Sequence, residues 1–330
     1  MTRQRIPDEV LGAAHARAAA RAARDWTEAD RLRGEIEAAG WKIVDRGTDF
    51  ALSPAAPADV PDEGRTRYGA SANVPSRLDD TPIGLATVVL LATDWPEDVS
   101  RALSGLADHA PEGTSIVVVA DAPSHEQATA LEVLEAGGGS GGLQAEVVWT
   151  SERLGTGAAI NAGVRRAEGP VVILLDTSVE PSGDFVTPLA EALDDPTVAV
   201  AGGWGIVSGD LRRFEEAPAG DVDAIEAYAL AFRRSDFAQR GPLDERFRFY
   251  RNLDIWWSLV LRDEGEGVAP RRALALADLP LLKHEHRGYA SLPPEERDRQ
   301  SKRNFYRIID RFGSRRDLLN RPGNGGGPGY

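Results

Sequence analysis

The sequence contains no cysteine among its 330 residues. A chain without cysteine forms no disulfide, builds no thiolate metal site and has no cysteine nucleophile. A metal ion would therefore take its ligands from Asp, Glu or His, and a nucleophile would be an oxygen atom.

Long apolar runs are also absent from the sequence. No stretch approaches the roughly 18 to 20 consecutive apolar residues that a membrane-spanning helix needs, and the opening MTRQRIPDEV lacks the apolar core of a signal peptide. We therefore expect a cytoplasmic protein without a membrane span.

Positive charge is scarce as well. The chain has 38 basic and 52 acidic side chains, which give a net charge of -14. A surface of this sign repels a phosphate backbone, so general binding to nucleic acid is disfavoured.

The first 50 residues differ from the rest in charge and pattern. They carry 9 basic and 9 acidic side chains, whereas the remaining chain carries 29 and 43. Ala-rich sequence with Arg and Glu at helical spacings predicts two helices, and residues 41–44 predict a short strand after them. We interpret residues 1–50 as a helical hairpin module.

The segment after this module has no apolar periodicity. Residues 51–84 are rich in Pro, Ala, Gly and Asp, which predicts a linker. The glycine-rich residues 321–330 predict a disordered tail. The main domain is therefore expected at residues 85–320.

The main domain alternates between strand and helix patterns. Its runs VVLLA, IVVVA and VVILL are short and continuously apolar, as in strands of a parallel sheet that helices cover on both faces. Ligands of such α/β sheets bind at the carboxyl ends of the strands. Asp94, Asp121 and Asp176 follow three of these runs, so we expect the functional site there.

Six motifs follow one another in the order TVVLLATDW, VVVADAPS, RLGTGAAINAGVRRAEGPVVILLDTSVEP, AFRRSDFAQRGPLDERFRFYRNLDIWWSL, KHEHRGY and RNFYRIIDRFG. With these motifs, residues 86–313 resemble the family 2 glycosyltransferases. The resemblance implies a GT-A type mixed sheet flanked by helices. It also implies a nucleotide-diphosphate sugar as donor and transfer of its sugar to an acceptor hydroxyl.

The resemblance assigns one group of residues to the nucleotide sugar. Asp121 would contact the base, and Arg153 could donate two hydrogen bonds to phosphate. Asp121 as a turn residue and Arg153 as a surface charge remain open alternatives. The implied nucleotide-sugar-binding residues are Thr93, Asp94, Asp121, Arg153, Asn161 and Asp176.

The family also implies a divalent metal, Mn2+ or Mg2+, held by an Asp-x-Asp motif after the fourth strand. Here the corresponding residues are Asp176, Thr177 and Ser178, so the last carboxylate is missing. One carboxylate and one hydroxyl are a poor ligand set for a hard cation, which puts metal binding in doubt. His284 or His286 could supply a further ligand.

A catalytic base is the second weak point of the resemblance. The position at which the family has its carboxylate holds Asn252, which accepts no proton at ordinary pH. Asp254 could serve as a displaced base, or could only favour the start of a helix. With Ser178 and Asn252 in place of carboxylates, a catalytically degenerate module that binds nucleotide sugars or acts as a scaffold is the alternative.

Basic side chains are in excess near the carboxyl end. The stretch 283–316 predicts a helix with Arg303, Arg307 and Arg311 on one face. A solvated face is the default interpretation, and binding of a diphosphate or an acidic partner is the alternative.

A second resemblance covers only the segment AARAARDWTEADRLRGEIEAAGWKIVDRGTDF. Residues 16–50 are similar to the C-terminal piece of bacterial cysteinyl-tRNA synthetases. This similarity implies a weaker alternative, association with RNA through residues 7–50. Packing of the module against the transferase domain is an equal expectation.

Overall fold

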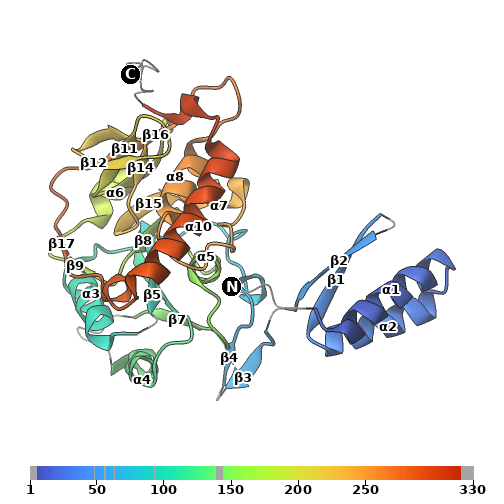
Figure 1. Ribbon diagram of the computed structural model, residues 1–330. Coiled ribbons are helices and arrows are strands. Elements are labelled where there is room, and N and C mark those ends of the chain that lie inside the picture. Colours follow the sequence, from blue (N-terminus) through green and yellow to red (C-terminus); the bar gives the residue numbers. More distant parts are fainter. Residues whose placement is uncertain are drawn as a thin grey trace. The chain divides into compact units, whose positions relative to one another are not determined.

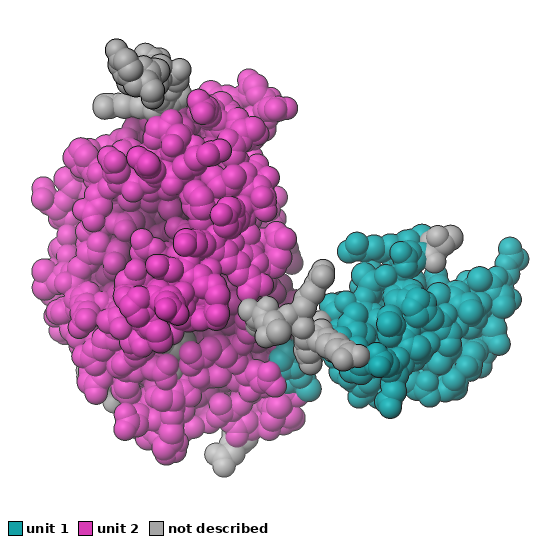
Figure 2. Space-filling view, viewed as in Figure 1, with its two compact units in different colours: residues 1–58 teal, residues 59–330 magenta. Residues whose placement is uncertain are grey.

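The structure is a computed structural model that describes residues 6–47, 49–55, 57–62, 64–92, 94–138 and 144–320. The chain divides into two compact units, residues 1–58 and residues 59–330 (Figure 2). Thr93 and the predicted tail at 321–330 lie outside the described residues. None of the described helices is both long enough and apolar enough to cross a membrane.

Unit 1 is a helical hairpin followed by a strand hairpin (Figure 1). The side chain of Asp25 starts the second helix by accepting a hydrogen bond from the N–H of Glu28. A small core containing Val10, Ile36 and Trp41 joins the helices to the strands. The elements are α1 (Asp8–Ala22), α2 (Trp26–Ala38), β1 (Trp41–Arg46) and β2 (Asp49–Pro54), with β1 and β2 antiparallel.

The segment predicted as a linker has defined structure over most of its length. Residues 51–54 complete β2 of unit 1, and β3 (Val60–Asp62) pairs with β4 (Arg65–Arg67) at the start of unit 2. The guanidinium carbons of Arg65 and Arg67 lie 4.2 and 4.9 Å from the centre of the Trp149 ring. Such cation–π contacts hold a polar segment in place without any apolar periodicity. Because the sequence of this segment shows no apolar periodicity, it was predicted as a linker.

Unit 2 is built on an eight-stranded mixed sheet with the order β13-β16-β10-β15-β8-β5-β6-β7. Strands β7, β6, β5 and β8 are parallel, and β15 runs antiparallel to β8 and to β10. The strands are β5 (Ala86–Ala92), β6 (Thr114–Ala120), β7 (Glu146–Trp149), β8 (Val171–Leu175), β10 (Val198–Gly202), β13 (Gly220–Val222), β15 (Ala229–Arg233) and β16 (Arg272–Ala275).

Helices cover both faces of this sheet (Figure 1). Val89 and Val117 pack with α5, α7, α8 and α10 on one face, and their neighbours Val88 and Val118 pack with α3, α4 and α6 on the other. This alternation confirms the predicted α/β class. The helices are α3 (Pro96–His109), α4 (His125–Val133), α5 (Thr156–Val164), α6 (Val186–Ala192), α7 (Arg234–Arg240), α8 (Leu253–Arg262), α9 (Arg287–Ala290) and α10 (Pro294–Phe312).

Short strands outside the main sheet bring distant segments together. Strand β9 (Val179–Pro181) pairs antiparallel with β17 (Leu281–Lys283), so residues 284–286 return beside residues 176–178. A separate three-stranded sheet contains β11 (Gly205–Ser208), β12 (Phe214–Ala217) and β14 (Ala224–Ile225).

Candidate functional site

Polar side chains gather where β5, β6 and β8 end. Because these strands are parallel, their carboxyl ends share one edge of the sheet, and the antiparallel β15 places its amino end at the same edge. Asp176 directly follows β8, and its N–H donates to the carbonyl of Tyr228 at 3.1 Å. The segment 226–228 before β15 therefore belongs to the predicted site.

Asp176 and His286 form a paired group at this edge. The Nε2 atom of His286 lies 3.3 Å from Oδ2 of Asp176, and its Nδ1 accepts a hydrogen bond from the N–H of Tyr289 at 3.0 Å. The imidazole therefore carries its proton on Nε2, facing the carboxylate. The ring of Tyr250 stacks on His286 with 4.5 Å between ring centroids, which holds the imidazole in this orientation.

The pair favours the charged forms of both side chains. Burial by itself would raise the pKa of Asp176, but hydrogen bonds from His286 and Ser178 outweigh it and hold that pKa below its usual value. Burial would lower the pKa of His286, but Asp176 outweighs it and raises that pKa above its ordinary value. The Asp176 carboxylate is thus held in its ionised form and faces the Nε2–H of His286, whose Nδ1 is already occupied by the N–H of Tyr289.

Of the four predicted metal ligands, Asp176, Ser178 and His286 lie together and His284 lies apart from them. Ser178 donates its hydroxyl to Oδ1 of Asp176, and His284 is paired elsewhere, with its Nε2 2.7 Å from Oε2 of Glu180. In the part of the chain that the structure describes, no group of three or more His, Asp or Glu residues could hold a metal ion. Asp176, Ser178 and His286 together offer a single carboxylate, one hydroxyl and one imidazole, a poor ligand set for a hard cation, so the residues do not fit a metal site built by the protein alone.

Asn252 and Asp254 lie at the start of α8. Asn252 has φ of 69° and donates its side-chain amide to the carbonyl of Ser301 at 3.1 Å, which ties α8 to α10. The two carboxylate oxygens of Asp254 accept from the N–H groups of Ile255 and Ala227, at 2.9 and 3.2 Å. Burial raises the pKa of Asp254 against these hydrogen bonds. Both side chains are engaged in holding the backbone.

Sequence reasoning missed Glu226, which lies beside Ala227 at the same edge. Burial raises the pKa of Glu226, and Lys283, with Nζ 3.8 Å from its Oε2, only partly offsets this. The Lys283 ammonium also lies 3.6 Å from the ring centre of Tyr228 and 4.6 Å from that of Trp204. In the sequence, Glu226 is recognisable only as an acid just before the apolar run YALAF. The antiparallel direction of β15 is what brings it to the site.

Asp121 is engaged in holding the loop between β7 and α5. Its Oδ1 accepts from the N–H of Leu154 at 2.7 Å, and its Oδ2 accepts from that of Gly155 at 3.1 Å. Burial raises the pKa of Asp121 despite these bonds. The exposed Arg153 lies in the same loop, with Nη2 3.5 Å from Oδ2 of Asp94 and 3.2 Å from the carbonyl of Ala122.

Asn161 is 1% exposed and has no open side toward a ligand. Its Oδ1 accepts from the N–H of Leu243, and its Nδ2 donates to the carbonyl of Leu243, each at 2.9 Å. The Nδ2 group also lies 3.2 Å from Oε1 of Glu245. Asn161 thus joins α5 to the turn at 242–247 by hydrogen bonds. The family resemblance had implied that it contacts the nucleotide sugar.

Two kinds of similarity identify the larger unit. The model of glycosyl transferase family 2 matches residues 87–252, half of the chain. The chain belongs to glycosyl transferase family 2. The family resemblance over residues 86–313 is thereby confirmed, although the match stops before the motifs at 283–313.

Solved structures agree with this assignment of the fold. The mannosyltransferase PcManGT from Pyrobaculum calidifontis, solved with GDP-Man and Mn2+, is 18% identical with a TM-score of 0.52, over 72% of this chain and 67% of that chain. GalNAc-T7, solved with UDP, GalNAc and Mn2+, is 16% identical with a TM-score of 0.56, over 69% of this chain and 48% of that chain. Unit 2 has the expected GT-A type fold.

The second resemblance is matched only briefly. The cysteine–tRNA ligase of Opitutus terrae is 48% identical over 50 residues, which are 15% of this chain and 11% of the ligase. The chain thus spans about a ninth of that protein. In unit 1, ion pairs join Arg17 to Asp45 and Arg33 to Glu37, and Arg31 to two glutamates, so these guanidiniums are already paired. The charge pattern adds no support for RNA binding.

Proposed function

We propose that this glycosyltransferase binds a nucleotide-diphosphate sugar at the carboxyl ends of β5, β6 and β8 and transfers the sugar to an acceptor hydroxyl. Family membership supports the class of reaction. The observation that carries the proposal is the pairing of Asp176 with His286 next to a half-buried carboxylate, Glu226, at the ligand-binding edge of the sheet.

Cationic groups of the chain are suited to the leaving diphosphate. When the bond between sugar and phosphate breaks, negative charge grows on the diphosphate, and fixed positive groups stabilise it. His286 carries an Nε2–H donor beside Asp176, and the positive charge of Arg251 acts on Asp254, Glu226 and Tyr228 from the same region. Arg153 stands near Asp94, where a phosphate could replace the carboxylate as its partner.

Glu226 is the candidate base for the acceptor. In a single displacement the acceptor oxygen bonds to the anomeric carbon, the bond from that carbon to the diphosphate breaks, and the hydroxyl proton passes to a carboxylate. Asp254 is less suited, because both of its oxygens accept backbone hydrogen bonds. Its bond to the N–H of Ala227 makes it a positioning residue for the adjacent Glu226.

The proposed reaction includes no metal step. The protein supplies a single carboxylate, so a divalent cation would depend on oxygens of the donor itself. If Mn2+ or Mg2+ takes part, Asp176, with the Ser178 hydroxyl and the His286 ring beside it, would hold it, and the cation would supply positive charge to the leaving diphosphate.

Calorimetry with a panel of UDP- and GDP-sugars, with and without manganese, tests the proposal. We expect at least one donor to bind, and release of the nucleoside diphosphate when an acceptor is added. Failure of every donor to bind would remove the proposed function.

The degenerate module remains the second candidate because of one observation. Asn252, at the expected base position, is held by the carbonyl of Ser301, and Ser178 hydrogen-bonds to Asp176 in place of a second carboxylate. The double variant Ser178→Asp with Asn252→Asp separates the candidates. If the native chain binds donors without turnover and the double variant turns them over, the chain is a degenerate binder.

A further inference from the structure

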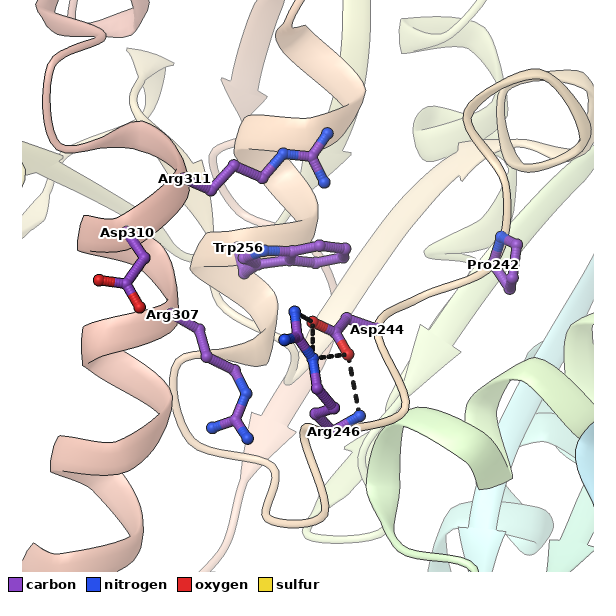
Figure 3. Close-up of a pocket in the computed structure, with 7 residues that line it drawn as sticks. All are labelled: Pro242, Asp244, Arg246, Trp256, Arg307, Asp310 and Arg311. Carbon is purple, nitrogen blue, oxygen red and sulfur yellow. Dashed lines mark hydrogen bonds and ion pairs between the residues drawn. The ribbon is translucent and has the colours of Figure 1, made fainter. Parts of the chain in front are cut away.

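A pocket of unit 2 lies on the other side of α8 from Asp254. The pocket has a volume of about 420 Å³. Asp254 faces Ala227 in the cleft, and Trp256, two positions along α8 and therefore about 200° around the helix, faces this pocket. The residues that line it are Pro242, Asp244, Arg246, Trp256, Arg307, Asp310 and Arg311 (Figure 3).

Arginine side chains dominate this pocket. Figure 3 shows Arg307 and Arg311 extending from α10 toward Trp256 and the turn at 242–246, while the Asp310 carboxylate points away from them. Arg246 enters from the turn and is paired with Asp244, with 2.6 Å between Nη2 and Oδ2. Of the two carboxylates that line the pocket, Asp244 is therefore already paired.

Arg307 and Arg311 lack a carboxylate partner among the described residues. The guanidinium carbon of Arg311 lies 5.2 Å from the Trp256 ring centre, and its contacts are with aromatic rings. Arg307 donates one Nη1 hydrogen bond, to the carbonyl of Arg303, and its Nε is buried without a partner. Burial lowers the pKa of both guanidinium groups. Two like charges one helical turn apart thus lie in a partly buried pocket without a direct ion pair, and the carboxylates around them, among them Asp244, only partly offset the effect of burial.

An anion would supply what this arrangement lacks. Guanidinium groups donate hydrogen bonds in a planar fork that matches the oxygens of phosphate, and several of them together suit an anion with more than one charge. The volume falls within the roughly 300–1,000 Å³ of small-molecule sites and exceeds that of one phosphate group.

We propose that this pocket binds the phosphate group of a small molecule, with Arg307 and Arg311 as hydrogen-bond donors and Arg246 as a third. The site is separate from the cleft at Asp176 and does not depend on transferase activity. The sequence shows an excess of basic residues on α10. Binding of phosphate would give these residues a function outside the transfer reaction.

Titration calorimetry of the full chain with inorganic phosphate, at constant ionic strength, tests this proposal. The variant Arg307→Gln with Arg311→Gln removes both charges, and Arg303→Gln is the matched control, because Arg303 is exposed on the same helix outside the pocket. We expect wild type and control to bind phosphate alike and the double variant to bind about tenfold more weakly or worse.

A melting experiment gives an independent measure if the double variant is less stable. Phosphate should raise the Tm of the wild type and of Arg303→Gln, but not that of either single variant Arg307→Gln or Arg311→Gln. Glycerol 3-phosphate replaces inorganic phosphate in a parallel series. Tighter binding of glycerol 3-phosphate identifies an organic phosphate as the ligand, and equal binding identifies free phosphate.

Three results would overturn the proposal. The first is no binding of phosphate to the wild type. The second is equal binding to the double variant, which would place the anion elsewhere. The third is equal binding of acetate, which would show a general attraction of anions without recognition of phosphate.

Discussion

The arginines of unit 1 and those beside α8 in unit 2 have the same chemistry and different surroundings. In unit 1, Arg17, Arg31 and Arg33 each reach a carboxylate of the same small unit. In unit 2, Arg307 and Arg311 lie in a pocket in which Asp244 is paired with Arg246. A guanidinium that already has a carboxylate partner must give it up to bind an anion, whereas Arg307 and Arg311 have no such partner to give up.

Two carboxylates, one in each unit, also differ in their surroundings. Asp45 accepts two hydrogen bonds from Arg17, which hold its pKa below the usual value. Glu226 is half-buried and its pKa is raised by that burial. A carboxylate whose ionised form is strongly stabilised is a poor proton acceptor, and one with a raised pKa is a better one.

The largest effect is expected from Glu226→Gln. Because the amide accepts no proton, kcat should fall by about 10²- to 10⁴-fold, while the affinity for the donor sugar stays unchanged. Steady-state kinetics and calorimetry measure the two quantities. The exposed Glu215→Gln is the matched control and should keep the wild-type rate.

A full rate in Glu226→Gln combined with loss of activity in Asp254→Asn would transfer the role of base to Asp254. In that case the raised pKa of Glu226 would have no role in catalysis.

The pH profile should show the same base. Burial raises the pKa of Glu226, so its ionised form is lost at a higher pH than for an ordinary glutamate with a pKa of 4.5. We expect kcat/KM to fall about tenfold per pH unit below that raised pKa. An acidic limb centred at or below 4.5 would contradict the raised pKa.

Asn161→Ala tests a residue of unit 2 whose polar atoms are all paired. The change leaves the N–H and carbonyl of Leu243 without their partners, so the free energy of unfolding should fall by about 2 to 3 kcal/mol. Urea unfolding measures it. The exposed Asn73→Ala, which loses one hydrogen bond to Asp59, should cost about 0.5 kcal/mol or less.

The smallest effect is expected in unit 1, from Asp45→Asn. Solvent screens this half-exposed pair, so the loss at pH 7 should be about 1 kcal/mol. Because the folded-state pKa of Asp45 is lowered, its stabilisation is present above pH 4 and disappears as the pH falls through that lowered value. Thermal unfolding at pH 7 and pH 3 measures both, with Asp30→Asn as control. An equal loss at both pH values would contradict the ion-pair explanation.

Local patterns were sufficient for the fold and for part of the site. The runs VVLLA, IVVVA and VVILL became β5, β6 and β8, because burial on both faces leaves a continuous apolar run in any such strand. Asp176 and His286 were both among the predicted residues, and the structure places them 3.3 Å apart.

Other residues could not be placed from local pattern. Asn161 was predicted to contact the nucleotide sugar and is instead buried against Leu243, because the direction of a helix side chain depends on what packs against the helix. Glu226 escaped notice because an isolated acid before a strand has no motif. Residues 51–84 were predicted as a linker because the contacts of Arg65 and Arg67 with Trp149 join positions that are distant in sequence and leave no local pattern.

The sequence by itself determined the order of strands and helices, the lack of thiol chemistry and the two positions where expected carboxylates are absent. These properties follow from each residue and its near neighbours. Only the tertiary structure decided which charges are paired and which are open. A side chain acquires its partners and its degree of burial from segments that are far apart in the chain, as Glu226 does from Lys283 and Arg311 from Trp256.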